Sequence, residues 1–388
     1  MIHAEGSQLR VCGKYLRQRR NKDALQTCRL IILQHVLPDT EELVGLLLEA
    51  GAELYCLIGK PYSVDRAVMR RLKRRGIRVL VPTCYRELED TAVIPKLLRA
   101  AIRKSKKDGK QIVIQEVGGY FASALSKLTP TQARFVAGVV EDTTFGLERY
   151  QSVVGGIRVP VFSVARSALK EIEARFVGDA AVKAVEREFR LLGASITGRH
   201  ALVVGYGMIG KNVARALREH NMTVSVYDRR DHRNINAFSV GYKIHKKLEL
   251  IKQADIIFSA TGKQAVSLSD LEIAKDEVVL ASVGSQDIEF DVHGLRELAV
   301  EVRRFSKHLE KFTLPSRKNV YLMSDGTAVN FVIGSVPSEV IDLVFAEILM
   351  CTFLLLKRPD RHKAGSVHPT PETYLNSIAK EWLKFINY

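Results

Sequence analysis

Ala201-Leu-Val-Val-Gly-Tyr-Gly-Met-Ile-Gly210, followed by Thr223-Val-Ser-Val-Tyr-Asp228, is the stretch of sequence that decides the fold. Its apolar residues predict a buried strand, and its glycines predict a tight turn into a helix over Lys211 to His220. The apolar residues after that helix predict a second strand, which ends at an acid. Strand, glycine turn, helix, strand and acid in this order are typical of a Rossmann-type unit.

Each position of this turn requires glycine for a separate physical reason. Gly205 allows the tight turn, Gly207 lets a pyrophosphate approach the backbone, and Gly210 lets the helix pack on the strand. Asp228 lies 18 residues after Gly210, where a carboxylate accepts hydrogen bonds from ribose hydroxyls. The residues expected to contact a dinucleotide here are Gly205, Gly207, Met208, Ile209, Gly210 and Asp228.

The composition indicates a folded chain of two domains. The 388 residues are 46% apolar, enough for each domain to bury its own core. The N-terminal residues 1–7 contain no apolar signal core. Val340 to Leu356 is apolar but contains Asp342 and Glu347, which favours a buried helix over a membrane span. We therefore expect a cytoplasmic protein that does not cross a membrane.

Five cysteines are spread along the chain without a Cys-x-x-Cys pair. Their odd number and spacing favour reduced thiols, and they predict neither a disulfide framework nor a metal site. They are Cys12, Cys28, Cys56, Cys84 and Cys351.

A formal net charge of +16 is the unusual bulk property of the chain. The basic residues gather in three runs, Arg17 to Lys22, Arg70 to Arg75 and Arg103 to Lys110. These runs fall on the polar faces of expected helices and lack the interleaved aromatic residues that stack on bases. The pattern favours a solvated basic surface over nucleic-acid binding.

In the N-terminal half, apolar strands alternate with amphipathic helices, which is typical of a doubly wound αβα domain. The expected strands are 29–34, 53–58, 77–81, 111–115 and 134–140, and the expected helices are 40–50 and 63–75. Two strands end in Glu116-Val-Gly-Gly119 and Glu141-Asp-Thr-Thr-Phe-Gly146. Because ligands bind at the carboxyl ends of strands in such sheets, these two segments are candidate binding loops.

The same alternation predicts the domain boundaries. Residues 1–192 are expected to form a substrate-binding αβ domain, and residues 193–337 a Rossmann-type domain inserted in it. Residues 338–388 then supply a helix that returns to the substrate domain and a C-terminal tail. A long helical stretch over 167–192 precedes the inserted domain, and we expect it to break near Gly178.

The order of these motifs resembles the S-adenosylhomocysteine hydrolase family from about Leu30 to the C-terminal tail. That family's Ala-Gly-Tyr-Gly-Asp-Val-Gly-Lys-Gly turn is similar to Val204-Gly-Tyr-Gly-Met-Ile-Gly-Lys-Asn212. Its Glu-Glu-Thr-Thr-Thr-Gly segment resembles Glu141-Asp-Thr-Thr-Phe-Gly146, and its Thr-Thr-Gly segment resembles Ala260-Thr-Gly262. Its Asn-Ile-Gly-His-Phe-Asp segment resembles Ser282-Val-Gly-Ser-Gln-Asp287, and its Ala-Glu-Gly-Arg-Leu-Val-Asn segment resembles Ser324-Asp-Gly-Thr-Ala-Val-Asn330. The resemblance implies a tightly held NAD that oxidises a ribose 3′-hydroxyl and is regenerated at the end of the reaction.

The residues that hold the cofactor survive in this comparison. Asp228 matches the family's ribose-binding acid, and Asn330 matches its asparagine at the nicotinamide amide. The further matches are strand-end residues, Thr143, Thr144, Thr261 and Gly262. Arg229 and Arg230 follow Asp228, and arginines there accept a 2′-phosphate, whereas Asp228 repels it. The sequence therefore favours NAD over NADP.

The catalytic residues of the family are mostly replaced. Ile172 and Ala174 stand in place of the second lysine and the aspartate of the family's Lys-Ser-Lys-Phe-Asp-Asn segment, and neither transfers protons. A further aspartate and two histidines of the family are replaced by Val117, Ser285 and Val336. His35 and Asp142 keep the family's active-site chemistry, and Glu116 is a third candidate for a proton relay.

Two of these candidates also have structural interpretations. A single histidine after a strand is often only hydrogen-bonded, and Asp142 before Thr-Thr is a good helix cap. Lys170 and Glu173 lie three residues apart, which is typical of an exposed ion pair on a helix. If that helix turns inward, Lys170 instead takes the place of the missing proton acceptor.

Two functions of different classes follow. The first is an NAD-dependent oxidoreductase-type enzyme that has diverged toward another nucleoside or polyol, by hydride transfer from a secondary hydroxyl. Hydrolysis of S-adenosylhomocysteine is not expected, because loss of each proton-transfer group costs ~10²-fold or more in rate. The second is a non-catalytic NAD-binding regulatory relative. By analogy with the family we expect one-carbon metabolism, a small nucleoside-like partner and a homo-oligomer, either a dimer or a tetramer.

Overall fold

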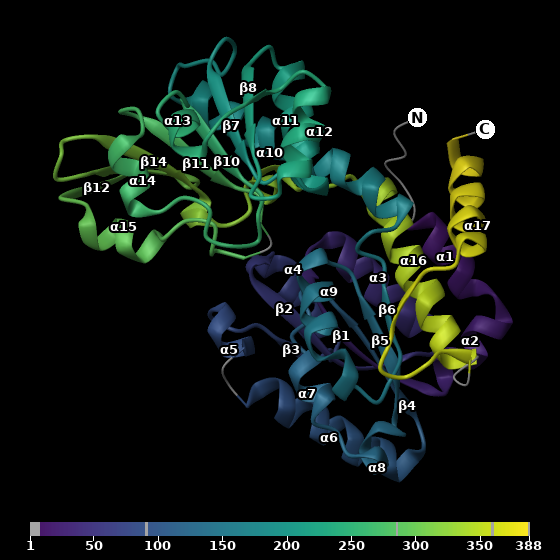
Figure 1. Cartoon of the computed structure of the whole chain (residues 1–388). Coiled ribbons are helices and arrows are strands. Elements are labelled where there is room, and N and C mark those ends of the chain that lie inside the picture. Colours follow the sequence, from purple (N-terminus) through teal and green to yellow (C-terminus); the bar gives the residue numbers. More distant parts are fainter. Residues whose placement is uncertain (1–7, 90–91, 285, 358–360, 387–388) are drawn as a thin grey trace. The chain divides into compact units, whose positions relative to one another are not determined.

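The computed structural model describes residues 8–89, 92–284, 286–357 and 361–386 (Figure 1). The chain divides into two compact units, one formed by residues 1–170 with 338–388 and the other by residues 171–337. Each unit has its own β-sheet between layers of helices. The α/β fold with a Rossmann-type sheet that the sequence predicts is confirmed.

In the described residues, the sheet of the first unit has seven strands in the order β15-β6-β5-β4-β1-β2-β3, and every neighbouring pair is parallel. The strands are β1 (Cys28–Val36), β2 (Glu53–Val64), β3 (Val79–Leu80), β4 (Gln111–Glu116), β5 (Val136–Glu141), β6 (Val161–Ser163) and β15 (Val367–Pro369). Since β1 lies between β2 and β4, the strand order reverses at β1. Ligands of open parallel sheets bind beyond the carboxyl ends of the strands at such a reversal.

Alternate side chains of β1 belong to different cores. Leu30 and Ile32 pack with helices on one face of the sheet, and Ile31 and Leu33 pack with helices on the other. The first layer contains α1 (Arg10–Arg17), α2 (Arg19–Gln26), α3 (Pro38–Glu49), α4 (Arg66–Arg74), α16 (Ser338–Lys357) and α17 (Glu372–Leu383). The second contains α5 (Tyr85–Glu89), α6 (Val93–Asp108), α7 (Ala122–Ser126), α8 (Pro130–Ala133) and α9 (Thr144–Val153). These three layers are those of a doubly wound domain.

Strand β2 is longer than the sequence indicated. It continues to Val64, so the helix expected from residue 63 begins only at Arg66. Asp65 caps that helix, and its side chain accepts hydrogen bonds from the backbone N–H groups of Ala67 at 2.7 Å and Val68 at 3.0 Å. The extension carries residues 59–64 of β2 to the carboxyl end of the sheet.

The sheet of the second unit has the order β12-β13-β14-β11-β10-β7-β8-β9. Its strands are β7 (His200–Val204), β8 (Thr223–Tyr227), β9 (Lys243–Ile244), β10 (Ile256–Ser259), β11 (Val278–Ser282), β12 (Glu301–Ser306), β13 (Leu309–Thr313) and β14 (Asn319–Met323). The pairs β12–β13 and β13–β14 are antiparallel, and the other pairs are parallel. The order reverses at β7, the strand that precedes the glycine turn.

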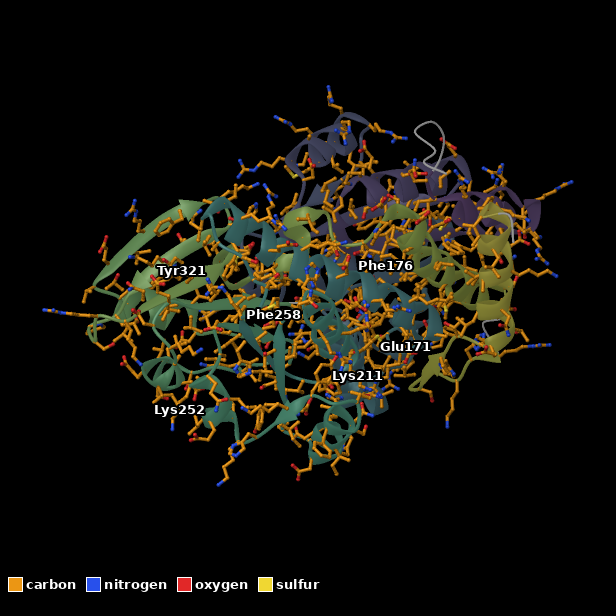
Figure 2. The ribbon with its side chains drawn as sticks, turned by 90° about the horizontal axis from the view of Figure 1, so that it is seen from above. Glu171, Phe176, Lys211, Lys252, Phe258 and Tyr321 are labelled. Carbon is orange, nitrogen blue, oxygen red and sulfur yellow. The ribbon has the colours of Figure 1, made fainter. Side chains whose placement is uncertain are left out.

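Helices cover both faces of this second sheet. They are α10 (Ala168–Leu191), α11 (Met208–Glu219), α12 (Asp231–Ser239), α13 (Lys247–Ile251), α14 (Leu268–Ile273) and α15 (Val292–Leu298). Ala201 and Val203 face one core, and Leu202 and Val204 face the other. Figure 2 shows Phe258 inside this unit, where it is fully buried.

Helix α10 differs from the expectation in two ways. It runs without a break from Ala168 to Leu191, so the expected break at Gly178 is wrong. A Cβ on Gly178 would lie 2.6 Å from the carbonyl carbon of Asn212, so this glycine serves the close approach of α10 to α11. The division between the units lies at residues 170 and 171, rather than at 192 and 193, because most of α10 packs in the second unit's core.

The basic runs lie on outward faces of helices. On α4, Arg70, Arg71 and Lys73 are exposed, while Val68 and Leu72 on the opposite side are buried. The apolar run near the C-terminus is the buried helix α16. In the described parts of the chain, no helix is both long and apolar enough to cross a membrane.

Candidate functional site

The glycine turn of the second unit closes tightly on its inner side. Gly205 has a φ of +94°, and a Cβ there would lie 2.7 Å from the carbonyl oxygen of Ala260. A Cβ on Gly210 would lie 1.8 Å from the carbonyl oxygen of Gly205, far inside van der Waals contact. A Cβ on Gly207 would first meet Nη1 of Arg233, at 3.5 Å. The backbone of Gly207 is therefore the part of the turn that a ligand can approach.

Helix α11 begins at this turn. Gly207 is its N-cap and Met208 its first residue, whereas the sequence indicated a start at Lys211. The first amides of a helix have no acceptor within the helix, so those of Met208, Ile209 and Gly210 are available to an anion. These N–H groups and the positive end of the helix dipole form a position for a pyrophosphate.

Asp228 follows β8, with its buried carboxylate facing the glycine turn. Its Oδ2 accepts a hydrogen bond from the backbone N–H of Tyr206 at 2.7 Å, and its Oδ1 accepts one from that of Arg230 at 2.9 Å. Nη1 of Arg233 lies 3.1 Å from Oδ2. Burial opposes ionisation, but these donors hold the pKa of the carboxyl below its usual value. Asp228 is therefore an anion beside the turn, as a ribose-binding acid requires.

A buried carboxylate that no sequence motif marks holds the strand end at Thr261 and Gly262. Oε1 of Glu289 accepts hydrogen bonds from the backbone N–H groups of Thr261 at 2.9 Å and Gly262 at 2.7 Å. Its Oε2 accepts from the hydroxyl of Thr261 at 2.6 Å and from that of Ser259. Because Glu289 lies 28 residues from Thr261, only the folded chain brings them together.

Asn330 lies in the 3-10 turn Val329–Ile333 and is buried. Its Nδ2 donates to the hydroxyl of Ser335 at 2.7 Å. Its buried Oδ1 accepts no hydrogen bond from the residues that the structure describes. Since an unsatisfied buried acceptor costs about 1–3 kcal/mol, a ligand N–H that reaches this oxygen would be stabilising.

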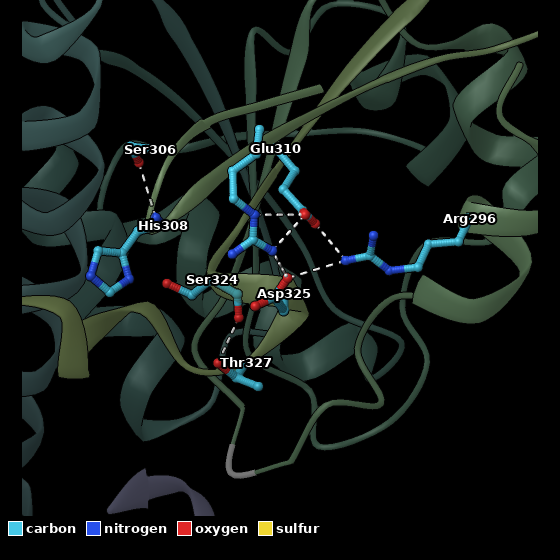
Figure 3. A network of polar contacts seen from close by, with 8 residues as sticks. Arg296, Ser306, His308, Glu310, Ser324, Asp325 and Thr327 are labelled. Atoms are coloured by element: carbon cyan, nitrogen blue, oxygen red, sulfur yellow. Dashed lines mark hydrogen bonds and ion pairs between the residues drawn. The ribbon is translucent and has the colours of Figure 1, made fainter. Parts of the chain in front are cut away.

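The loop before Asn330 has an unusual backbone, and the polar contacts around its residue Asp325 are drawn in Figure 3. Residues 324–326 have φ values of +49°, +53° and +78°. Arg296 and Arg304 both place Nη2 at 3.1 Å from Oδ1 of Asp325, the central residue of the loop. Left-handed conformations at non-glycine residues persist only where the surroundings hold them. The two arginines therefore fix the path of the chain toward Asn330.

The second unit thus offers three kinds of binding group. They are the amides at the start of α11, the carboxylate of Asp228 and the amide oxygen of Asn330. NAD presents a pyrophosphate, ribose hydroxyls and a carboxamide to such groups. The residues present fit this cofactor.

His35 lies near the carboxyl end of β1, where the first unit's strand order reverses. Its Nδ1 shares a short hydrogen bond with the hydroxyl of Ser63 on β2. Burial, together with the positive charges of Lys60 and Lys170, holds the pKa of His35 well below its usual value. The imidazole is therefore neutral at neutral pH, and burial with the two lysine charges disfavours its protonation.

Lys170 is largely buried and forms an ion pair with Asp142. Its Nζ lies 2.8 Å from Oδ1 of Asp142, and the two side chains are 13% and 9% exposed. The exposed position that the helical spacing with Glu173 indicated is therefore wrong for Lys170. The alternative in which this helical turn faces inward is the one observed.

Asp142 does not cap the next helix. The N-cap of α9 is Thr143, whose hydroxyl oxygen accepts a hydrogen bond from the backbone N–H of Gly146 at 3.0 Å. That hydroxyl also donates to Oε1 of Glu141 at 2.6 Å. Thr144 is exposed at the first helical position. Both threonines belong to the first unit, and their contact with a cofactor stays a prediction.

Two further buried carboxylates bind the loop after β4. Oε2 of Glu116 accepts a hydrogen bond from the backbone N–H of Tyr120 at 2.7 Å, and its Oε1 accepts one from the hydroxyl of Tyr150. Oε2 of Glu141 accepts from the backbone N–H of Gly119 at 2.9 Å. Burial raises the pKa of both carboxyls, and the charge of Glu141 adds to the increase at Glu116. These bonds order the loop, and a proton-relay role for Glu116 stays a prediction.

Glu347 on α16 ties the start of α10 to the first unit. Its carboxylate accepts hydrogen bonds from the hydroxyls of Ser167 at 2.7 Å and Thr370 at 2.5 Å. The oxygen of Ser167 in turn accepts from the backbone N–H of Lys170 at 3.1 Å. Burial raises the pKa of Glu347 to about 7. In the sequence this acid only interrupts an apolar run, so its link to Lys170 could not be foreseen.

Lys60 is a second buried lysine at this edge of the sheet. Its Nζ lies 5.6 Å from the ring centres of both Tyr62 and Tyr85, a cation–π arrangement. Burial lowers the pKa of Lys60 to about 8, although Glu141 and Asp142 favour its charged form. No motif surrounds Lys60, and it was not among the residues selected from the sequence.

The described residues at the positions where the resemblance predicts replaced catalytic groups have apolar side chains. Val117 and Ala174 are buried, and Ile172 is 41% exposed. Val336 is partly exposed. Ser285, which takes the place of a family histidine, lies outside the described residues.

Comparison with protein families gives a match to the S-adenosyl-L-homocysteine hydrolase NAD-binding domain, over residues 180–336. The matched segment falls within the second unit, residues 171–337.

Curated relatives match over most of the chain. An adenosylhomocysteinase of Pyrobaculum aerophilum is 30% identical over 370 residues, which cover 90% of this chain and 83% of the relative. An adenosylhomocysteinase of Saccharolobus solfataricus is 29% identical over 83% of this chain and 76% of the relative. One of Sulfolobus acidocaldarius is 28% identical over 95% of this chain and 87% of the relative.

Proposed function

The chain belongs to the adenosylhomocysteinase family, and we propose that it is an NAD-dependent enzyme that oxidises a secondary hydroxyl of a nucleoside or polyol other than S-adenosylhomocysteine. The observation that carries this proposal is the buried Lys170–Asp142 pair in the same unit as the neutral His35. Burial of such a pair costs desolvation free energy, and a role in proton transfer accounts for that cost.

NAD, when bound, supplies the hydride acceptor. We assign its pyrophosphate to the turn at Gly207 and the start of α11, and its adenosine ribose to Asp228. We assign its carboxamide to the unsatisfied Oδ1 of Asn330. Thr261 and Gly262, held by Glu289, line the neighbouring strand end.

We assign proton transfer to Lys170 and Asp142. Nζ of Lys170 passes a proton to Oδ1 of Asp142 across 2.8 Å and then, as the free amine, accepts the proton of the substrate hydroxyl. Because Glu347 binds the hydroxyl of Ser167, whose oxygen accepts the backbone N–H of Lys170, it holds this lysine in position. His35, as a neutral imidazole, is the further residue that we assign to this site.

Cleavage of S-adenosylhomocysteine does not fit the side chains present. Elimination of a thioether needs an acid or base at the carbon next to the oxidised one as well as at the hydroxyl. Val117 stands where the family has an aspartate, and it transfers no proton. The proposed reaction needs only the hydroxyl proton and the hydride.

The test is incubation of the NAD-loaded protein with a panel of nucleosides and polyols, read by absorbance of reduced nicotinamide. The proposal expects reduction with at least one member and none with S-adenosylhomocysteine. Bound NAD that no member of the panel reduces would instead favour the second candidate, a non-catalytic NAD-binding regulatory relative. The observation that favours that candidate is the apolar character of Val117 and Ala174.

Assembly into a homodimer or homotetramer, and a place in one-carbon metabolism, stay predictions from the family resemblance. Light scattering of the purified full chain measures the assembly. A monomer at micromolar concentration would contradict the first of these predictions.

A further inference from the structure

The adenosine end of the glycine turn carries an arginine in an unusual place. Arg233 lies in the first turn of α12, and its Nη1 is 3.1 Å from Oδ2 of Asp228. The same nitrogen lies 3.5 Å from where a Cβ on Gly207 would stand. The guanidinium therefore lies between the acid and the open side of the turn.

Arg233 pairs with the negative charge of Asp228, the charge that repels a 2′-phosphate. Oδ2 already receives the backbone N–H of Tyr206 and the guanidinium of Arg233, and Oδ1 receives the backbone N–H of Arg230. An acid that repels a 2′-phosphate does so through its unshielded negative charge. Here that charge is paired at short range, which weakens the repulsion.

The local sequence adds further positive charge. Residues 228–233 contain three arginines and two aspartates, a net charge of +1 at this point of the chain. Arg229 and Arg230 are exposed, as is Asp231, the second carboxylate of the segment. Guanidinium groups bind phosphate with two parallel hydrogen bonds, which makes arginine the preferred residue for a ribose phosphate.

We propose that this site accepts adenine dinucleotides with and without a 2′-phosphate, and that Arg233 decides between them. With a plain ribose, the hydroxyls bind the carboxylate of Asp228. With a 2′-phosphate, the guanidinium of Arg233 turns from Asp228 to the phosphate, supported by Arg229 or Arg230. This inference rests on the dinucleotide site of the proposed function, and it revises the preference for NAD alone that the sequence indicated.

The size of the effect follows from the bonds involved. Hydrogen bonds to charged groups change binding constants by about 10- to 100-fold each. Loss of Arg233 therefore removes about tenfold or more of the affinity for a 2′-phosphate. Affinity for the unphosphorylated ribose stays equal or rises slightly, because Asp228 is released from its ion pair.

Calorimetry of the full chain with two small probes isolates the adenosine end. The probes are adenosine 5′-monophosphate and adenosine 2′,5′-bisphosphate, followed by NAD and NADP. The variants are Arg233→Gln and Arg233→Lys. The control is Arg215→Gln, an arginine on α11 that is paired with Glu219 through Nη1 at 2.5 Å. The unfolding temperature of each variant is recorded first.

The wild type should bind the bisphosphate at least as tightly as the monophosphate. Arg233→Gln should shift this ratio about tenfold or more toward the monophosphate, Arg233→Lys by less, and Arg215→Gln not at all. The lysine variant keeps the charge and loses only the paired hydrogen bonds, so it reports on Arg233 even if the glutamine variant folds poorly.

Binding of NAD with rejection of NADP by about 100-fold or more in the wild type would overturn this inference and leave the proposed function intact. An unchanged ratio in both Arg233 variants would also overturn it. Failure of the wild type to bind either dinucleotide would refute the cofactor site itself.

Discussion

The glycine turn of the second unit and the carboxyl end of the first unit's sheet are built in opposite ways. The turn uses consecutive residues, and its geometry requires the positive φ of Gly205 and the absence of a Cβ at Gly210. The sheet edge uses side chains from β1, β2, α10 and α16, which lie far apart in the sequence. The first kind of site resists substitution, whereas the second can change its chemistry one side chain at a time.

This difference agrees with the proposal that the chemistry of the chain has diverged further than its cofactor binding. The described residues around Gly207, Asp228 and Asn330 fit the family's cofactor. In the first unit, by contrast, the resemblance places Val117 at the position of a family aspartate, and Lys60 and Glu347 are further buried titratable groups. Substitutions at the glycine turn should therefore change the affinity for NAD. Substitutions at the sheet edge should change the reaction rate or a pH dependence.

The largest effect is expected from Asp142→Asn. Loss of the carboxylate that receives the proton of Lys170 should lower the rate of nicotinamide reduction by ~10²-fold or more. NAD affinity, measured by calorimetry, should change much less than the rate, because the groups assigned to the pyrophosphate, ribose and carboxamide lie in the second unit. Asp179→Asn, at a partly exposed aspartate on α10 that is paired with Lys183, is the control. Equal rates in the two variants would remove Asp142 from the mechanism.

Glu347→Gln tests the sheet edge through the pH dependence of the free energy of unfolding. The pKa of Glu347 is about 7 in the folded chain, against an ordinary value of 4.5. Because the folded pKa is raised, the stability that its protonation contributes is complete below pH 4.5 and is lost as the pH rises through 7. Over this window the wild type should lose up to about 3 kcal/mol relative to Glu347→Gln.

Urea unfolding at several pH values measures this loss. Glu339→Gln, at an exposed position near the start of the same helix α16, should give a curve parallel to the wild type. If the Glu347→Gln curve is parallel as well, the carboxyl is not protonated in the folded chain at neutral pH.

Gly207→Ala should act on binding alone. Its Cβ would meet no protein atom closer than 3.5 Å, so the unfolding temperature should hardly change. The methyl group would keep the pyrophosphate from the amides, with an expected loss of about 10- to 100-fold in NAD affinity. Gly210→Ala, whose Cβ would lie 1.8 Å from the Gly205 carbonyl oxygen, should instead unfold at clearly lower temperature. Full NAD affinity in Gly207→Ala would place the ligand elsewhere.

Asn330→Ala should give the smallest change. Loss of one neutral hydrogen bond to the carboxamide lowers affinity by about 2- to 10-fold. AMP, which has no carboxamide, is the matched ligand and should bind variant and wild type alike. A drop in AMP affinity would show that the substitution disturbs the whole unit.

The glycine turn was predictable because its information is local. Three glycines, a strand before them and an acid after them are sufficient to predict the turn and the role of Asp228. The alternation of strands and helices also predicted the doubly wound sheet. The break predicted at Gly178 was wrong because this glycine instead lets α10 approach Asn212. Asn212 lies in a helix that follows the next strand, so the local sequence does not show this contact.

The sheet edge was predictable only in part. His35 and Asp142 were selected because they match active-site residues of the family that the sequence resembles. The inward position of Lys170 depends on where α10 begins, and this is set by Ser167 and Glu347, 180 residues apart. Glu289 and Lys60 carry no motif at all, because a buried carboxylate or ammonium is identified by what packs around it.

The most direct test of the central claim compares Lys170→Met with Lys183→Met, two lysines of the same helix, of which the first is 13% and the second 52% exposed. Both variants are loaded with NAD and given the nucleoside or polyol that the wild type oxidises, and the absorbance of reduced nicotinamide is followed. Reduction should be lost in Lys170→Met, with NAD still bound, and retained in Lys183→Met. Undiminished reduction in Lys170→Met would contradict the account.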